Sequence, residues 1–286
     1  MIFGLLAAVG WGLTDFLGAV SGRRLGSLPA LAVSQLVGII GAVVLFVVHG
    51  TGFGPMGGLW GFLIANGVIA MIAYSLHYRA LELGPVAVVS PVGAGYAVVG
   101  FALTVLLLHE HPGGIAILGG VITIGGVFLV SANLPALRAR LHEKPPGLWW
   151  ALGSAVGFGV AGVLLGVIAR DSHDWVVTLF STRLVLVAAY LPLLIGRRKT
   201  FHKVSGAGIG AYVAGGAAGA FDLLGVASYS AGATRGFLSI VLAASAIFPM
   251  IAVGMSVVIL KERLVFNQYV GVAVVVTGLL MLGLGS

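Results

Sequence analysis

Charged residues are too few in this chain to cover a water-facing surface. Only 8% of its 286 residues are Asp, Glu, Lys or Arg, and 59% are hydrophobic, whereas a soluble domain carries about 25% charged residues. The surrounding solvent must therefore be lipid. Inside a bilayer the backbone satisfies its own hydrogen bonds only in helices or closed barrels. The apolar runs are continuous over about 20 residues and do not alternate with polar residues, which selects helices.

Charged residues, prolines and glycines divide the chain into ten apolar segments long enough to cross a bilayer. We therefore predict an all-α integral membrane protein with ten transmembrane helices. The first segment lacks a basic leader and is followed by similar segments, so we expect it to be retained rather than cleaved as a signal peptide. The predicted spans are 2–20, 29–49, 58–81, 86–108, 113–131, 147–169, 175–196, 205–231, 236–260 and 265–285.

The two halves of the chain resemble each other in sequence. The hexapeptide AAVGWG at 7–12 returns as SAVGFG at 154–159, after 147 positions. Further matches follow in the same order: Ser34-Gln35-Leu36-Val37 with Thr182-Arg183-Leu184-Val185, Tyr78-Arg79-Ala80 with Tyr229-Ser230-Ala231, and Glu110, Gly119 and Gly126 with Glu262, Gly271 and Gly278. Such an internal repeat indicates a duplicated fold.

We assign residues 1–131 to a first five-helix repeat, 132–146 to a linker and 147–286 to a second five-helix repeat. Because five is an odd number, the second repeat should cross the membrane in the opposite direction to the first. Inverted repeats that meet near the bilayer midplane are typical of secondary transporters. The repeat therefore predicts a carrier as well as a fold.

Several motifs occur in order along nearly the whole chain: Trp11-Gly12, Tyr78-Arg79-Ala80-Leu81, Pro91, Glu110 before a glycine-rich fifth segment, and a second-half run from Tyr229 through Glu262 to Gly278. This order resembles the EamA-like branch of the drug/metabolite transporter (DMT) superfamily. The resemblance implies a central cavity lined by the first four helices of each repeat, with helices five and ten at the periphery. It leaves the substrate open, because that superfamily moves amino acids, drugs, amines and nucleotide sugars.

Apart from Arg79, which lies in the segment that closes the third span, three charged residues lie within predicted spans, namely Asp15, Arg183 and Asp222. An intramembrane charge costs about 2.5–3.5 kcal/mol on insertion scales, so it usually faces a cavity or a partner. A structural Asp–Arg pair is one interpretation, but a single arginine leaves one carboxylate free for a proton or for the ammonium of a substrate. We take Asp15 and Asp222 as candidate proton-coupling residues. Asp15 lies near the end of its span, so an interfacial position is its alternative.

Trp11 and Asp15 are four residues apart and share one face of a helix. An indole ring and a carboxylate suit a cationic or amine-bearing ligand, although packing against lipid would also explain the tryptophan. An interfacial aromatic belt is the alternative for the tyrosines and histidine near the end of the third span. The candidate substrate-binding residues are Trp11, Asp15, Gln35, Tyr74, His77, Tyr78, Arg183, Asp222 and Tyr229, with Asn66, Ser90, Tyr96, Ser239 and Ser245 as weaker polar candidates.

Glu110 and Glu262 each precede a predicted span, and we expect each to cap the positive end of that helix. His109-Glu110-His111 could suggest a metal site, but its repeat mate is Lys261-Glu262-Arg263, and two cations do not bind a metal. Glycines seven residues apart in the fifth and tenth spans allow close helix contact. Packing within a monomer is favoured for them over a homodimer interface.

The sequence favours a secondary transporter of a small organic metabolite in a bacterial inner membrane, working by alternating access. Its partners would be a small-molecule substrate, protons and membrane lipids, and export is favoured over import. Without a nucleotide-binding G-x-x-x-x-G-K-[ST] motif, an ion or substrate gradient must drive transport. A facilitative uptake permease and a lipid flippase remain alternatives.

Other classes of protein are disfavoured. No nucleophile–base pair or metal motif at helical spacing supports an enzyme, and we expect no cofactor and no metal. The chain has no cysteine, which excludes disulfides and thiol chemistry. The net charge of +7 lies in short loops and indicates membrane orientation rather than a nucleic-acid partner.

The basic residues predict an orientation. Of 15 Lys and Arg, 12 lie in odd-numbered loops, which places those loops in the cytoplasm and both termini outside. The resemblance implies termini inside. A C-terminal reporter that is active only in the cytoplasm should therefore stay silent, and a strong signal would contradict this prediction. The odd-loop residues are Arg23, Arg24, Arg79, Arg138, Arg140, Lys144, Arg197, Arg198, Lys199, Lys203, Lys261 and Arg263.

Overall fold

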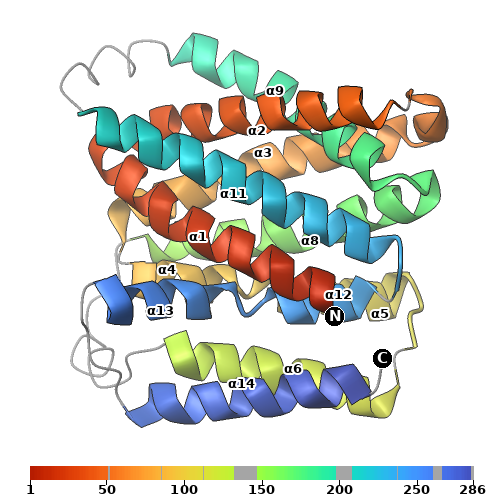
Figure 1. The fold of residues 1–286 in the computed structure, drawn as a ribbon, viewed down its shortest axis with the longest axis vertical. Coiled ribbons are helices and arrows are strands. Elements are labelled where there is room, and N and C mark those ends of the chain that lie inside the picture. The colour runs from red at the N-terminus through yellow and green to blue at the C-terminus, as the bar shows by residue number, and fades with distance from the viewer. Residues whose placement is uncertain are drawn as a thin grey trace.

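The computed structural model describes residues 1–50, 52–84, 86–111, 113–131, 147–197, 208–236, 238–259 and 266–284. Every regular element in these ranges is a helix (Figure 1). The predicted linker 132–146, the carboxylate Glu262 and many of the odd-loop cations lie outside the described residues. The elements are α1 (Ile2–Leu25), α2 (Ser27–His49), η1 (Gly54–Met56), α3 (Trp60–Leu83), α4 (Val86–Gly93), α5 (Tyr96–Leu107), α6 (Gly114–Ser131), α8 (Leu148–Ser172), α9 (Trp175–Gly196), α11 (Ile209–Ala233), α12 (Leu238–Ser245), α13 (Phe248–Ile259) and α14 (Phe266–Leu284).

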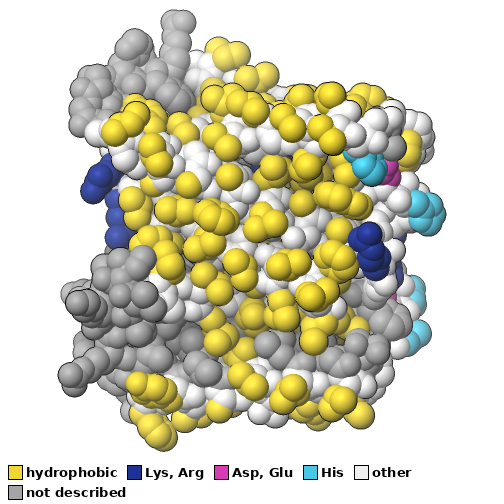
Figure 2. Space-filling model, in the orientation of Figure 1, with side chains coloured by type: hydrophobic (Ala, Val, Ile, Leu, Met, Phe, Trp, Pro, Cys, Tyr) yellow, Lys and Arg dark blue, Asp and Glu magenta, His cyan; other side chains and the backbone are white. Residues whose placement is uncertain are grey.

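Six described helices are individually long and apolar enough to cross a bilayer. They are α1, α2, α3, α8, α9 and α11, with 22–25 residues each. In Figure 2 hydrophobic side chains cover the middle of the visible face, whereas Lys, Arg and His side chains lie at its left and right edges, where the helices end. This distribution is expected for helices that cross a hydrocarbon layer between two aqueous phases. The prediction of an all-helical membrane protein is confirmed.

The predicted spans 86–108 and 236–260 are each divided into two shorter helices. The first break, at Ala94 and Gly95, separates α4 from α5, and the second, at Ala246 and Ile247, separates α12 from α13. At each break a backbone N–H donates to a carbonyl three residues earlier, as in Gly95 N to Val92 O at 3.1 Å and Met250 N to Ile247 O at 2.9 Å. Such tighter turns interrupt the α-helical pattern. Both breaks lie at equivalent positions of the repeat, so they belong to the duplicated unit.

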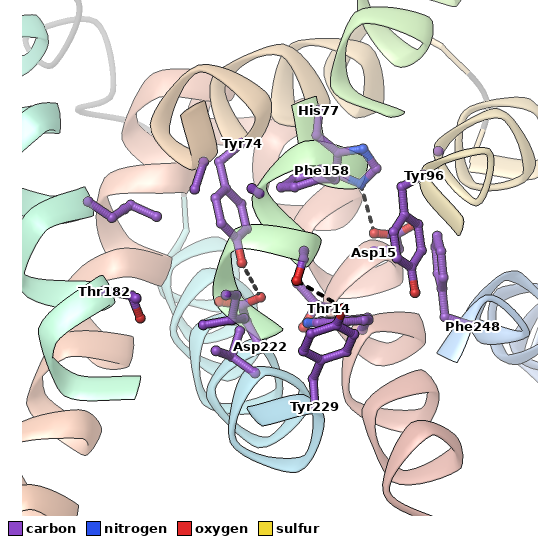
Figure 3. A pocket seen from close by; sticks show the side chains of 18 of the residues that line it. Thr14, Asp15, Tyr74, His77, Tyr96, Phe158, Thr182, Asp222, Tyr229 and Phe248 are labelled. Atoms are coloured by element: carbon purple, nitrogen blue, oxygen red, sulfur yellow. Dashed lines mark hydrogen bonds and ion pairs between the residues drawn. The ribbon is translucent and has the colours of Figure 1, made fainter. Parts of the chain in front are cut away.

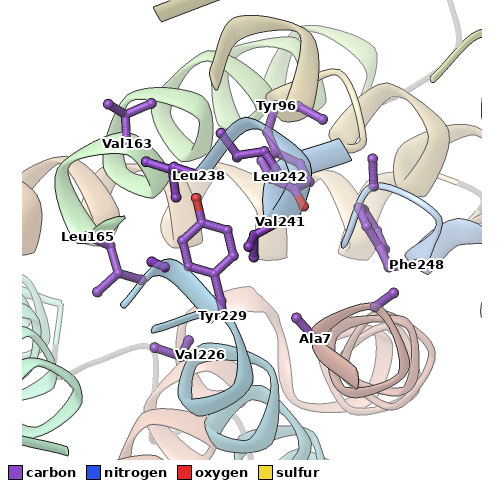
Figure 4. Packing of buried hydrophobic residues seen from close by; sticks show 14 of the residues in the cluster. Ala7, Tyr96, Val163, Leu165, Val226, Tyr229, Leu238, Val241, Leu242 and Phe248 are labelled. Carbon is purple, nitrogen blue, oxygen red and sulfur yellow. The ribbon is translucent and has the colours of Figure 1, made fainter. Parts of the chain in front are cut away.

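The two repeats interlock, because the main helix contacts join one repeat to the other. α1 packs along α11, α3 along α8, and α6 along α14. Figure 4 shows this packing near the second break, where Tyr229 of α11 lies among Leu238 and Leu242 of α12, with Ala7 of α1 nearby. The core therefore lies between the repeats rather than within either one.

The glycine stripe of α6 and α14 allows the backbones of these two helices to approach closely. A Cβ added to Gly278 would lie 2.6 Å from the backbone nitrogen of Thr123, and one added to Gly126 would lie 2.8 Å from that of Val275. Both separations are shorter than real Cβ contacts. The predicted use of these glycines for packing within the monomer is confirmed. The α6–α14 pair lies along one edge of the bundle (Figure 1).

The prediction that Glu110 caps the helix following it is wrong. Its two carboxylate oxygens accept hydrogen bonds from the backbone nitrogens of Leu238 and Ser239, each at 3.0 Å. Glu110 therefore caps α12 in the second repeat instead of α6. Arg170 at the end of α8 completes the arrangement, with its Nη1 2.8 Å from Glu110 Oε1. The physical principle was correct, since a carboxylate does neutralise the positive end of a helix, but the helix belongs to the other repeat.

Adding a methyl group at Gly278 should destabilise the protein, because the Thr123 backbone occupies the space that the methyl needs. Overpacking of this kind costs about 1–3 kcal/mol. Gly125 is a matched control on α6, because no atom outside its own helix lies within 4 Å of its added Cβ. We expect Gly278→Ala to lower the thermal unfolding midpoint in detergent and Gly125→Ala to leave it unchanged or higher. Equal effects of the two substitutions would contradict this account of the α6–α14 contact.

Candidate functional site

A cavity lies between the two repeats. Its walls come from α1, α3, α8, α9 and α11, and from both helix breaks through Gly93, Tyr96 and Phe248. Of the described residues, none from α6 or α14 lines it. Figure 3 shows polar and aromatic side chains from both repeats converging on this space. The polar and charged lining residues are Thr14, Asp15, Asn66, Tyr74, His77, Tyr78, Tyr96, Thr182, Arg183, Asp222 and Tyr229.

Asp15 and His77 form the first charged pair of the cavity. Asp15 Oδ1 lies 2.8 Å from His77 Nε2, and only 4% of Asp15 and 6% of His77 are exposed. Ser90 of α4 donates a hydrogen bond to the other carboxylate oxygen. Ser154 of α8 lies 3.4 Å from His77 Nδ1. Side chains from α1, α3, α4 and α8 thus meet in one buried polar cluster.

Two features of the neighbouring helices fix the position of the His77 ring. A Cβ on Gly93 would lie 3.3 Å from His77 Cε1, so the absence of a side chain lets the imidazole lie against the end of α4. Phe158 of α8 contacts the ring edge-on, with 5.5 Å between the centroids. Phe158 also contacts Tyr74 of α3 at 4.9 Å. The break after Gly93 and the packing of α8 therefore both position the Asp15–His77 pair.

Arg183 and Asp222 form a second charged pair. Arg183 Nη2 lies 2.8 Å from Asp222 Oδ2, and the two residues are 3% and 1% exposed. Gln35 Oε1 accepts from Arg183 Nη1 at 2.6 Å, and the Tyr74 hydroxyl donates to Asp222 Oδ1 at 2.7 Å (Figure 3). Gly38 lies beside the guanidinium, where an added Cβ would make an ordinary van der Waals contact with Arg183 Cζ at 3.6 Å. Each charge thus has both an ionic and a neutral partner, as a low-dielectric interior requires.

An aromatic wall, made of Trp11, Tyr96, Tyr229 and Phe248, borders the same cavity. Trp11 lies edge-on to Tyr96 at 5.9 Å between centroids and tilted to Tyr229 at 5.6 Å, and Tyr96 lies 6.1 Å from Phe248. The indole lies against Gly225 of α11, where any Cβ would meet its atoms at 2.5 Å. Ring faces attract cations, and tryptophan does so most strongly. The wall therefore offers an apolar surface that also favours positive charge.

The structure places eight of the nine candidate residues in the cavity wall, and Gln35 behind it through its hydrogen bond to Arg183. Asp15, His77 and Tyr78 are buried among neighbouring helices. The expectation of an unpartnered carboxylate is corrected, because Asp15 is paired with His77. The sequence argument counted only arginine as a partner.

The weaker candidates occupy supporting positions. Asn66 donates to the Ala161 carbonyl at 2.7 Å, and Ser245 shares a hydrogen bond with the Tyr96 hydroxyl. The Ser239 backbone nitrogen belongs to the Glu110 cap rather than to the cavity.

Sequence reasoning missed Phe158 and Phe248, although the repeat carried a signal for both. Phe158 occupies in SAVGFG the position that Trp11 occupies in AAVGWG. Phe248 begins α13 as Tyr96 begins α5, at the equivalent position of the repeat. The mate of each selected aromatic could therefore have been selected too. Ser154, Thr14 and Thr182 carried no comparable signal, because small hydroxyl residues are common in membrane helices.

Comparison with known proteins agrees with the fold and the cavity. The sequence matches the EamA-like transporter family over residues 1–132 and again over 145–284. The chain belongs to the EamA-like transporter family. It is accordingly a multi-pass membrane transporter of the DMT type. A solved structure described only as the crystal structure of a protein superposes on this EamA-like chain with a TM-score of 0.76 at 16% identity, covering 99% of this chain and 96% of the other, which shows a shared fold. A search of curated proteins found no match.

The Arg183–Asp222 pair should reveal itself in a double-mutant cycle. Arg183→Gln leaves Asp222 as an uncompensated buried charge, and removing one partner of such a pair costs about 3–5 kcal/mol. The double variant Arg183→Gln with Asp222→Asn should lose less stability and less transport than Arg183→Gln alone. The measurements are the thermal midpoint in detergent and substrate uptake in proteoliposomes. Losses that simply add would show that the two side chains are not coupled.

Proposed function

We propose that this EamA-like protein is an alternating-access carrier that exchanges a small amine-bearing or cationic organic solute for protons, with export as the favoured direction. The observation that carries the proposal is the Asp15–His77 pair, buried in the wall of a cavity that also presents the aromatic wall. Carboxylate and imidazole groups can both take up and release a proton. The same carboxylate attracts an ammonium group. Binding of one therefore disfavours binding of the other, and this competition couples the two fluxes.

The arrangement of the helices supports alternating access. In Figure 1, α1 runs from right to left and α8 from left to right, and the later helix pairs α3 and α11, and α6 and α14, are likewise opposed. We infer that the two repeats are inverted and that, with each broken pair counted as one span, the chain crosses the membrane ten times. Inverted repeats supply two conformations of nearly equal energy, related by exchange of the roles of the two halves.

The contacts of the proton-binding pair suggest how protonation and conformation are linked. Ser90 belongs to α4, the first half of a broken helix, and Ser154 belongs to α8 of the second repeat. Ser90 lies in the same repeat as Asp15, whereas the Ser154–His77 contact joins the two repeats, so movement of one repeat relative to the other would change that contact. The proton affinity of the pair would then differ between the two conformations, as coupling requires. The protein would reside in a bacterial inner membrane, where a proton gradient is available.

Asp15→Asn should abolish proton-driven accumulation, because an amide does not titrate. His77→Gln should shift the pH dependence of transport without abolishing substrate binding, because the carboxylate remains. The assay is uptake of labelled amines into proteoliposomes under an imposed pH gradient, with correct folding checked by size-exclusion chromatography. Asn66→Gln is a suitable control, since it changes the cavity wall without changing its charge.

Concentrative uptake at the wild-type rate by Asp15→Asn would refute coupling at this residue. Transport by the wild-type protein that ignores the pH gradient would instead support the alternative of a facilitative permease. If no amine is transported but fluorescent phospholipids change leaflets, the alternative of a lipid flippase would replace the carrier.

A further inference from the structure

We propose that the cavity exchanges one proton for one singly charged organic cation, so that a complete transport cycle moves no net charge across the membrane. This inference rests on the proposed function, because it assumes proton-coupled exchange of an amine. It goes further by fixing the stoichiometry and the charge of the substrate. The basis is the number of charges that the cavity wall contains and the partners that each charge already has.

Among the residues that the structure describes, four side chains that can carry a charge line the cavity. Asp15 comes from α1, His77 from α3, Arg183 from α9 and Asp222 from α11. The other wall elements, namely α8 and the breaks beside Gly93, Tyr96 and Phe248, contribute neutral groups. The tyrosines in the wall stay neutral near pH 7 because a phenol titrates near 10.

The Arg183–Asp222 pair contributes a net charge of zero that stays constant. Both members are almost completely buried and joined at 2.8 Å. Gln35 on one side and Tyr74 on the other occupy further hydrogen-bonding positions of the pair. We therefore count both members as ionised throughout the cycle, because each lies 2.8 Å from an opposite charge in a low-dielectric interior. The variable charge of the cavity therefore lies in Asp15 and His77 alone.

The Asp15–His77 pair has two accessible states with different total charge. When Asp15 is a carboxylate and His77 is a neutral imidazole, the pair carries a total charge of minus one. Adding one proton brings that total charge to zero. Adding the second pair changes neither value. The deprotonated cavity can return to neutrality by binding a single positive charge. Trp11, one helical turn from Asp15, and the rest of the aromatic wall provide the surface on which such a cation would rest.

Neutrality in both loaded states favours this exchange on physical grounds. A buried uncompensated charge is costly in a low-dielectric interior, so the proton-loaded and cation-loaded forms are the two that can change conformation at least cost. The empty deprotonated form carries one uncompensated charge, so we expect it not to change conformation. A doubly charged amine would leave the cavity positive, and a neutral solute would leave it negative. Because neither loaded form carries net charge, the membrane potential exerts no force on either transition.

The test uses the purified full-length protein in proteoliposomes with the pH gradient and the membrane potential set independently, the potential by valinomycin and potassium. The probes are tetramethylammonium, tetraethylammonium and phenethylamine as single cations, and 1,4-diaminobutane as a double cation. We expect a single cation to accumulate until its concentration ratio equals the imposed proton ratio, with no change when the potential is altered. We expect the diamine to be excluded.

Two variants separate charge from structure. Asp15→Asn removes the carboxylate charge, so that with a neutral His77 the empty cavity is neutral and the cation-loaded cavity is positive. Uptake by this variant should become dependent on the potential and independent of the pH gradient. Ser90→Ala removes a hydrogen bond to Asp15 but no charge. Its transport rate can change, whereas the final concentration ratio should remain equal to the proton ratio.

The outcomes distinguish this inference from the proposed function. Accumulation that follows the pH gradient but also changes with the potential, or that reaches the square of the proton ratio, would overturn the one-to-one stoichiometry and leave proton coupling intact. Transport of amines without any response to the pH gradient would overturn both proposals. The absence of transport for every single cation in the panel would also overturn both, because the substrate class would be wrong.

Discussion

The low dielectric constant of the interior of this bundle is the constraint on which the rest of its structure depends. Four charge-bearing side chains lie in the cavity wall, and each has a partner within hydrogen-bonding distance: Asp15 with His77, and Arg183 with Asp222. In a low-dielectric interior the cost of leaving any of them alone would be several kcal/mol. Pairing therefore decides which helices must lie next to one another. The first pair joins α1 to α3 within one repeat, and the second joins α9 to α11 within the other.

The duplicated architecture turns these two pairs into one site. Each repeat contributes one charged pair and one broken helix, and the helix contacts between repeats place both pairs around the same space. The charges themselves do not follow the symmetry of the repeat, since Arg183 corresponds to the neutral Gln35. The fold is thus nearly symmetric while the chemistry is not. A cavity whose two halves differ in chemistry can recognise an asymmetric solute even though the fold around it is nearly symmetric.

Sequence reasoning was most successful where a residue's environment follows from composition and periodicity. Long apolar segments predicted the helical membrane fold, and the repeat predicted which glycines bring α6 and α14 together. It failed where a partner comes from a distant part of the chain. Glu110 has the chemistry of a helix cap, but its helix is α12, which begins more than a hundred residues later. His77 was recognised as a candidate, yet its pairing with Asp15 depends on how α1 and α3 are rotated against each other.

The sequence by itself determined that this chain is an integral membrane protein, that it is helical, and that its two halves share one fold. It could do so because hydrophobicity and repeats are properties of the linear order of residues. The sequence also identified the charged residues of the cavity, because placing a charge in a membrane span costs free energy and such charges are usually functional. Only the tertiary structure decided which charges neutralise which, where the fourth and ninth spans break, and that Phe158 and Phe248 complete the walls of the cavity. Those features depend on distances and directions between helices, and such distances arise only when the two repeats pack against each other.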